Sequence, residues 1–168
     1  NVSVVASIAT KPTQFASILS WSKSIASDRI VPFASVHPDD PDVLEHIGDI
    51  KAAGCLGLKL HPYYQKFTLT EDRIYRLFER IDQEGLIVLL HTGFDIAYEH
   101  IRIVDPIKIR ALIDTFPGLK LIASHFGAWS DWDEVDRYLL GRELYIDTSH
   151  SMQFMGDERV RRFLLEHS

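Results

Sequence analysis

The sequence has a single cysteine, Cys55, among its 168 residues. One cysteine excludes an internal disulfide and a thiolate metal cluster, and its place in an apolar run predicts a buried, unreactive thiol in a reducing compartment. Basic residues are fewer than acidic ones: the chain has 18 lysines and arginines and 24 aspartates and glutamates, which gives a formal net charge of −6. Since no basic cluster or basic aromatic groove is present, nucleic acids and anionic membranes are poor candidate partners.

Long hydrophobic runs and phosphate-binding glycine motifs are also absent. No stretch approaches the roughly 18 uninterrupted apolar residues of a membrane span, and no charged-then-apolar leader opens the chain, which predicts a cytoplasmic protein. No Gly-x-Gly-x-x-Gly or Gly-x-x-x-x-Gly-Lys follows an apolar run, so dinucleotide-binding and P-loop folds lose support. The length and the ordinary share of hydrophobic residues, 46%, predict one globular domain over residues 1–168.

Four short apolar runs each stop at a histidine. The runs are residues 30–36, 55–60, 87–90 and 119–124, and the histidines that follow them are His37, His61, His91 and His125. A parallel strand is buried on both faces, so a polar residue at its end marks the exit into a loop. If these strands are neighbours, their carboxyl ends share one edge of the sheet and the imidazoles meet there. Gathered imidazoles are typical of a metal site.

Helical patterns alternate with these runs. Two further strands are predicted at residues 2–9 and 143–146, and each of the six strands is followed by apolar residues spaced three and four apart. The clearest helix starts are Asp40-Pro41, Thr70, Asp105-Pro106 and Asp157. The six units repeat about every 24 to 34 residues, which predicts a parallel sheet covered by helices with right-handed crossovers.

The predicted fold class is α/β, a (β/α)8 TIM barrel. Such a barrel repeats the strand–helix unit eight times. The chain enters a strand pattern just after Asn1 and stops at Ser168 at the close of a helical pattern. We therefore expect an internal piece of a larger fold, strands 2 to 7 of the barrel, with the first and last strands missing. An incomplete barrel exposes sheet edges and apolar interior, so it should oligomerise, misfold or be completed by the missing segments, and a homo-oligomer is one of these expectations.

Three motifs stand at the ends of the central runs: Gly57-Leu58-Lys59-Leu60-His61-Pro62, Leu90-His91-Thr92-Gly93 and Ser124-His125-Phe126-Gly127. In this order and spacing they resemble the amidohydrolase superfamily, specifically its amidohydrolase-2 branch of metal-dependent TIM-barrel hydrolases. Asp147-Thr148-Ser149 also looks like the seventh-strand ending of that family.

The resemblance implies a divalent metal, usually zinc, at the carboxyl-end mouth of the barrel. His91 matches the fifth-strand ligand of the family, and His125 matches the sixth-strand histidine, which binds a second metal or contacts the substrate. A first-strand His-x-His and a last-strand aspartate complete the site in that family, and neither occurs in these residues. We predict His91 and His125 as metal ligands.

Lys59 is a second candidate because a lysine in an apolar strand must pair, lose its charge or react. It shares a strand face with His61, two residues on. The open interpretations are a carboxylated lysine bridging two metals, a cation for a substrate carboxylate, an imine-forming amine, or a side chain that leaves the strand end for water. We predict Lys59 and His125 as the catalytic residues.

Substrate contacts are predicted at His61 and in the loops above the mouth, where aromatic side chains wall substrate pockets. The aromatic candidates are Tyr63, Phe94 and Trp129, with Tyr64 and Trp132 beside them. Asp147 is interpreted either as a partner that fixes a histidine tautomer or as a loop cap. His37 is interpreted as a turn residue before Pro38. His150 follows the last predicted strand, where it can reach the mouth, but a structural role is favoured for it. The remaining histidines are interpreted as solvated surface: His46, His100 and His167.

The first functional hypothesis is a metal-dependent hydrolase that attacks a small organic amide, ester or lactone with metal-activated water. A nonoxidative decarboxylase on the same scaffold is the main alternative, since it needs the same metal and a cation near the carboxylate. A metal-free lyase or aldolase would use Lys59 as an imine-forming amine, but it leaves the histidine pattern unexplained. A truncated barrel used as a non-catalytic scaffold is the third alternative.

Overall fold

The computed structural model describes residues 1–98 and 101–167, and its six strands form one sheet in the order β1 to β6. All five neighbouring pairs are parallel. The strands are β1 (Ser3–Ala6), β2 (Ile30–Ala34), β3 (Gly57–Leu60), β4 (Ile87–Leu90), β5 (Lys120–Ala123) and β6 (Tyr145–Ile146). The predicted parallel sheet is confirmed, although the outer strands are shorter than the sequence pattern suggested.

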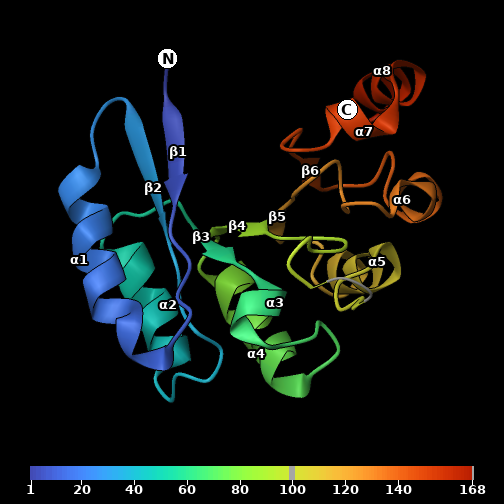
Figure 1. Cartoon of the computed structure of the whole chain (residues 1–168). Helices are drawn as coiled ribbons and strands as arrows, with labels where there is room; N and C mark the ends of the chain where they lie inside the picture. The colour runs from blue at the N-terminus through green and yellow to red at the C-terminus, as the bar shows by residue number, and fades with distance from the viewer. Residues whose placement is uncertain (99–100, 168) are drawn as a thin grey trace.

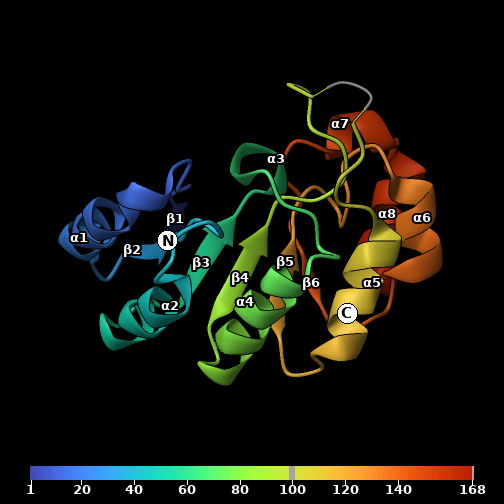
Figure 2. The same ribbon diagram turned by 90° about the horizontal axis from the view of Figure 1, so that it is seen from below.

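A helix follows each strand and covers the outer side of the sheet (Figure 1). The main helices are α1 (Phe15–Ile25), α2 (Val43–Ala52), α4 (Asp72–Gln83), α5 (Pro106–Thr115), α6 (Trp132–Tyr138) and α8 (Asp157–Glu166), with a 3-10 turn, η1 (Pro12–Gln14), before α1. Two single-turn helices, α3 (Pro62–Gln65) and α7 (Met152–Met155), lie with residues 91–98 and 101–105 at one edge of the sheet (Figure 2). This edge is formed by the carboxyl ends of the strands.

The sheet curls, with the helices on its convex side, as in part of a (β/α) barrel (Figure 1). Side chains alternate across a strand, and in β4 they alternate in burial as well. Val88 and Leu90 are fully buried under the helices, whereas Leu89 on the concave face is only half-buried. The predicted partial TIM barrel is confirmed by this alternation of strands and helices around one curved sheet.

Two predicted helix starts were wrong, and one loop was misinterpreted. α2 begins at Val43 with Asp42 as its N-cap, and the Asp40 carboxylate stabilises the turn before it, accepting from the amide of Asp42 at 3.1 Å and contacting Nδ1 of His46 at 3.0 Å. α4 begins at Asp72, after Glu71, so Thr70 is not its cap. Residues 62–67, predicted as a loop, contain the helical turn α3.

β1 and β6 are the outer strands of the sheet in the described part of the chain. Val2, just before β1, is 63% exposed, Val4 within β1 is 54% exposed, and Tyr145 in β6 is 68% exposed. Within residues 1–98 and 101–167, no helix has the length and apolar character that crossing a membrane requires.

Candidate metal centre

The strand register brings the candidate side chains into one row on the concave face. Leu60 pairs with Leu90, and Leu90 pairs with Ala123, so the residues that follow these positions lie side by side. Because the pairing Ile122 with Tyr145 extends the same register to β6, the row contains His61, His91, Ser124 and Asp147. Local alternation and parallel pairing alone therefore gather these four residues.

His61 and His91 stack face to face at the centre of this row. Their ring centroids are 4.0 Å apart with an interplanar angle of 13°, and Tyr64 stacks on the other face of His61 at 4.0 Å. The Nε2 atoms of the two histidines lie 3.5 and 3.4 Å from Oδ2 of Asp95. These three buried side chains offer ligand atoms that all lie within 4.8 Å of one another.

Asp95 comes from the connection between β4 and α5, which the surrounding backbone holds in place. Its Oδ1 accepts a hydrogen bond from the amide of Ala97 at 2.8 Å, which leaves Oδ2 for the imidazoles. The amide of Phe94 donates to the carbonyl of Trp129 at 3.0 Å. Arg102, further along the connection, forms ion pairs with Asp131, at 2.8 Å, and with Glu134 in α6. The carboxylate is thus fixed above the strand ends.

Both stacked imidazoles are neutral near pH 7. Burial, together with the nearby Lys59 and His125, lowers the pKa of His61 to about 4. Burial and the neighbouring His61, His125 and Lys59 lower the pKa of His91 to about 2. A neutral imidazole keeps one nitrogen lone pair, which is the form that binds a metal.

The donor set fits a divalent metal ion. Within the described residues, His61 Nδ1 and His91 Nε2 are buried and have no hydrogen-bond partner. Of these two atoms, His91 Nε2 lies beside the Asp95 carboxylate, whereas His61 approaches Asp95 with its other nitrogen, Nε2. Buried polar atoms are normally paired, so an unpartnered His91 Nε2 next to a buried carboxylate fits a site for a cation. Two imidazoles and one carboxylate are ligands that zinc and related metals accept. His61, His91 and Asp95 therefore form a group able to bind a metal ion.

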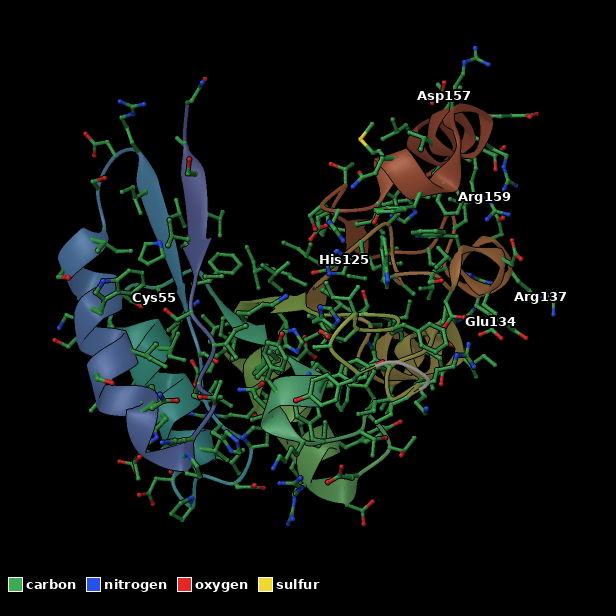
Figure 3. The ribbon with its side chains drawn as sticks, in the orientation of Figure 1. Cys55, His125, Glu134, Arg137, Asp157 and Arg159 are labelled. Atoms are coloured by element: carbon green, nitrogen blue, oxygen red, sulfur yellow. The ribbon has the colours of Figure 1, made fainter. Side chains whose placement is uncertain are left out.

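His125 lies against His91 but outside this group. Its Nε2 is 3.2 Å from His91 Nδ1, and its Nδ1 is 3.0 Å from the carbonyl oxygen of Ser149. Figure 3 shows His125 at the end of β5, inside the curve of the sheet. His125 and Phe126 both have positive φ, 62° and 53°, a region that side chains other than glycine rarely adopt. This conformation turns the His125 ring back toward His91.

Asp147 holds the backbone around His125. Its Oδ1 accepts from the amide of His125 at 3.0 Å, from the amide of Ser149 at 2.9 Å and from the Ser149 hydroxyl at 2.6 Å. Burial alone would raise the pKa of the Asp147 carboxyl, but these hydrogen bonds lower it overall, so the group is ionised at neutral pH. Asp147 thus acts as the loop cap that one of its two interpretations described.

Lys59 is buried on the concave face, one row below the histidines. Its Nζ donates to the Ser124 hydroxyl at 3.4 Å. Burial lowers the pKa of the amine to about 8, while the charge of Asp147 opposes that shift. The amine stays inside the barrel, so the interpretation as a side chain that leaves the strand end for water was wrong.

A cavity of about 250 Å³ opens beside the metal-binding group. It is lined by Tyr64, His91, Phe94, Asp95, Ile96, His125, Trp129 and His150. Phe94 and Trp129, two of the predicted substrate contacts, therefore face one space with two of the predicted metal ligands. His61 does not line this cavity. It lies behind Tyr64 and within the metal-binding group.

Tyr63 has a structural position instead. Its side chain is only 1% exposed, and its hydroxyl donates to the carbonyl of Gly93 at 2.7 Å. The ring stands edge-on to His91 with centroids 5.7 Å apart. The ring does not line the cavity shared by Phe94 and Trp129, so the predicted substrate contact of Tyr63 stays a prediction. Tyr63 supports the segment that carries Asp95.

The other histidines are mostly distant from the cavity. His37 accepts from the amide of Asp39 at 3.1 Å, in the predicted turn. His46 is not solvated surface, since it stacks on Phe15 at 3.8 Å and contacts Asp40. His150 lines the cavity and packs against Trp129 at 4.9 Å, while His167 contacts the carbonyl of Leu144 at 2.9 Å. His100 lies outside the described residues.

Sequence reasoning missed Asp95 and Ser149. Asp95 lies in a connection without periodicity, and its one signal was a position four residues after His91. Ser149 contributes a backbone carbonyl as well as its hydroxyl, and a main-chain acceptor carries no mark in the sequence.

A comparison with protein families finds one match, to a family model described as Amidohydrolase, over residues 4–164. This match covers nearly the whole chain. The chain belongs to the amidohydrolase family. Members of this family usually depend on a metal, which agrees with the group formed by His61, His91 and Asp95. No curated protein sequence matches the chain.

Solved structures share the fold of this family member at low sequence identity. A TIM-barrel protein from Bordetella bronchiseptica is 20% identical with a TM-score of 0.56, covering 80% of this chain and 48% of that one. A probable 2-pyrone-4,6-dicarboxylic acid hydrolase from Acinetobacter baumannii is 15% identical with a TM-score of 0.59, covering 89% and 54%. A 2,6-dihydroxybenzoate decarboxylase from Rhizobium is 14% identical with a TM-score of 0.60, covering 92% and 62%. The chain thus spans between 48% and 62% of these three structures.

Proposed function

We propose that this chain carries the metal-binding mouth of a metal-dependent hydrolase that acts on a small organic amide, ester or lactone. The observation that supports this most strongly is the convergence of His61, His91 and Asp95, in which the buried Nε2 of His91 faces the carboxylate without a hydrogen-bond partner among the described residues. A divalent ion at such a site, with zinc as the first candidate, supplies Lewis acidity that activates water and polarises a carbonyl oxygen. Family membership supports the same reaction class.

The residues of the chain have distinct parts in this proposal. His61, His91 and Asp95 hold the metal, and His125 orients His91 and faces the cavity in which a substrate would lie. Phe94 and Trp129 exclude water from the apolar part of the substrate. The Lys59 amine lies below the histidine row, where a cation stabilises negative charge on a substrate or on a neighbouring carboxylate.

A nonoxidative decarboxylase is the second candidate. The buried amine of Lys59 supports it, because a cation near the metal favours binding of a substrate carboxylate. The aromatic lining of the cavity suits an aromatic or unsaturated acid. Two of the structurally similar proteins are described as decarboxylases, of 2,6-dihydroxybenzoate and of 5-carboxyvanillate.

The test begins with metal binding by the purified protein. Zn²⁺, Co²⁺ and Mn²⁺ affinities are measured by competition with a chromophoric chelator for the wild type, His91→Ala and Asp95→Asn. His46→Ala serves as the matched control, because His46 contacts Asp40 and Phe15 and lies outside the metal-binding group. We expect both site variants to bind at least about 10-fold more weakly and the control to bind like the wild type. Equal affinities in all four proteins would refute the metal site.

Activity then separates the reaction classes. The metal-loaded protein is offered a panel of amides, esters and lactones, monitored by acid release, and a panel of aromatic carboxylic acids, monitored by CO₂ release. Turnover of the first panel alone supports the hydrolase, and CO₂ release alone supports the decarboxylase. Borohydride trapping with the same compounds tests the imine route, since only an imine at Lys59 is reduced to a stable adduct. An adduct formed without metal would overturn both metal-dependent proposals.

A further inference from the structure

The proton on His125 can be assigned from its contacts with Ser149. His125 Nδ1 lies 3.0 Å from the carbonyl oxygen of Ser149 and 3.1 Å from its hydroxyl oxygen. A carbonyl oxygen only accepts. The Ser149 hydroxyl has one proton and donates it to Oδ1 of Asp147 at 2.6 Å, since a carboxylate can only accept. Both Ser149 oxygens are thus acceptors toward the ring, and Nδ1 of His125 must carry a proton.

The proton on His125 Nδ1 also determines which nitrogen of His91 is protonated. With Nδ1 protonated, a neutral His125 has its lone pair on Nε2. That atom lies 3.2 Å from His91 Nδ1, so a hydrogen bond between the two rings requires that His91 donate from Nδ1. A neutral His91 that carries its proton on Nδ1 has its lone pair on Nε2.

The second nitrogen of His91 then meets a carboxylate. His91 Nε2 lies 3.4 Å from Asp95 Oδ2, and among the described residues it has no hydrogen-bond partner. A lone pair and a carboxylate oxygen at this distance repel each other unless a cation lies between them. The competing arrangement, a proton on Nε2 donated to Asp95, would give a hydrogen bond along this line. The observed geometry does not align one.

We propose that Asp147 and Ser149 are positioning residues that act through His125 to fix His91 in the tautomer whose Nε2 lone pair points at Asp95. We call this chain of hydrogen bonds the relay: the Ser149 hydroxyl donates to Asp147, His125 Nδ1 donates to Ser149, and His91 Nδ1 donates to His125 Nε2. In this arrangement His125 acts on His91. It departs from the family role, in which the corresponding histidine binds a second metal or contacts the substrate. The functional meaning of this tautomer, an Nε2 lone pair available to a metal, rests on the proposed metal site.

The tautomer can be measured without metal or substrate. In uniformly ¹⁵N-labelled, metal-free protein, long-range ¹H–¹⁵N spectra recorded well above the ordinary histidine pKa of about 6.5 distinguish a protonated ring nitrogen from an unprotonated one. We expect protonated Nδ1 and unprotonated Nε2 for both His91 and His125. A proton on Nε2 of His91 would overturn the relay. Because no catalysis is involved, this result is independent of whether the hydrolase proposal is correct.

Variants test the direction of the relay. His125→Phe removes the acceptor for His91 Nδ1, so His91 should move to a mixture of tautomers and Zn²⁺ affinity should fall about 10- to 100-fold. His125→Asn repeats the test with a residue that tolerates positive φ, in case the phenylalanine variant does not fold. His150→Phe is the matched control, because His150 lines the same cavity and contacts Trp129. It should leave the His91 resonances and the Zn²⁺ affinity unchanged.

The role of Asp147 has its own readout. Asp147→Ala frees the Ser149 hydroxyl to donate, so one of the two acceptors that favour a proton on Nδ1 of His125 is lost and the ring should show a partial shift toward the other tautomer. Zn²⁺ affinity should fall less than in His125→Phe, because the Ser149 carbonyl remains as an acceptor. If Asp147→Ala and His125→Phe both bind Zn²⁺ within about 2-fold of the wild type, the two residues do not position the ligand and the proposal is wrong.

Discussion

Gly93 offers the sharpest test of how the metal-binding segment is held. Its φ is +83°, and a Cβ added there would lie 2.0 Å from the backbone nitrogen of Trp129 and 2.5 Å from the carbonyl carbon of Ala128. Gly54 has nearly the same φ, +79°, but nothing lies within 4 Å of its added Cβ. Gly93→Ala and Gly54→Ala therefore share a conformational cost and differ in one steric contact.

The expected magnitudes follow from these two geometries. An alanine with positive φ costs about 1–2 kcal/mol in either variant. Gly93→Ala adds an overlap with backbone atoms, which no rotamer can relieve, and overpacking of this kind costs about 1–3 kcal/mol more. For a chain of this size each kcal/mol lowers Tm by about 2–4 °C. Gly93→Ala should thus be less stable than Gly54→Ala by about 1–3 kcal/mol.

Urea unfolding monitored by circular dichroism measures this difference, and the chelator competition described above measures its effect on the site. Because Gly93 lies two residues from Asp95, we expect Gly93→Ala also to weaken Zn²⁺ binding by at least about 10-fold. Gly54→Ala, which follows α2, should bind Zn²⁺ like the wild type. If the two variants lose equal stability, within about 0.5 kcal/mol, the close approach of residues 93 and 129 is absent and the account of the segment fails.

Three further predictions concern other parts of the fold. Tyr63→Phe leaves the Gly93 carbonyl without its buried donor and should cost about 1–3 kcal/mol, with faster amide hydrogen exchange in residues 93–98 and 101–103. Asp105→Ala removes the N-cap of α5 and should cost about 1 kcal/mol, whereas Asp105→Asn should retain most of the cap. Burial opposes the lowered pKa of Asp105, but the hydrogen bonds from Lys108 outweigh it. This stabilisation is therefore present above the unfolded pKa of about 3.9 and lost as pH falls through the lower folded pKa, so urea midpoints of the wild type and Asp105→Ala should converge in acid. Cys55 is 6% exposed, and burial raises the pKa of its thiol, so a thiol reagent should label it in urea but not in native buffer; rapid labelling of the native protein would contradict its burial.

The sheet was predictable because each strand carries its own signal. The apolar runs before His61, His91 and His125 marked three central strands, and parallel pairing made their ends meet without further information. The start of α5 at Asp105-Pro106 was also correct, since the Asp105 side chain accepts from the Lys108 amide. These features depend on residues close in sequence, which is why a sequence pattern can reveal them.

The details that depend on distant partners were not predictable. Asp40-Pro41 has the signature of a helix start, but α2 begins at Val43, and the Asp40 side chain contacts both the amide of Asp42 and the ring of His46, which stacks on the distant Phe15. Tyr63 was expected in the mouth because it follows a strand end, yet its hydroxyl bonds to Gly93, 30 residues away. Similarly, the connection that carries Asp95 takes its shape from contacts with Trp129 and α6.

The strand order has a consequence for how the chain folds. Since β1 to β6 pair in the order in which they occur, each new pairing closes a loop of only one strand–helix unit. The entropy of loop closure grows slowly with length, by about 0.6 kcal/mol per doubling, so these closures have nearly equal costs. His91 and His125, 34 residues apart, meet after a single such closure. Pairing of β4 with β5 therefore brings the two imidazoles together, and the contacts of His125 with Asp147 and Ser149 form when β6 joins the sheet.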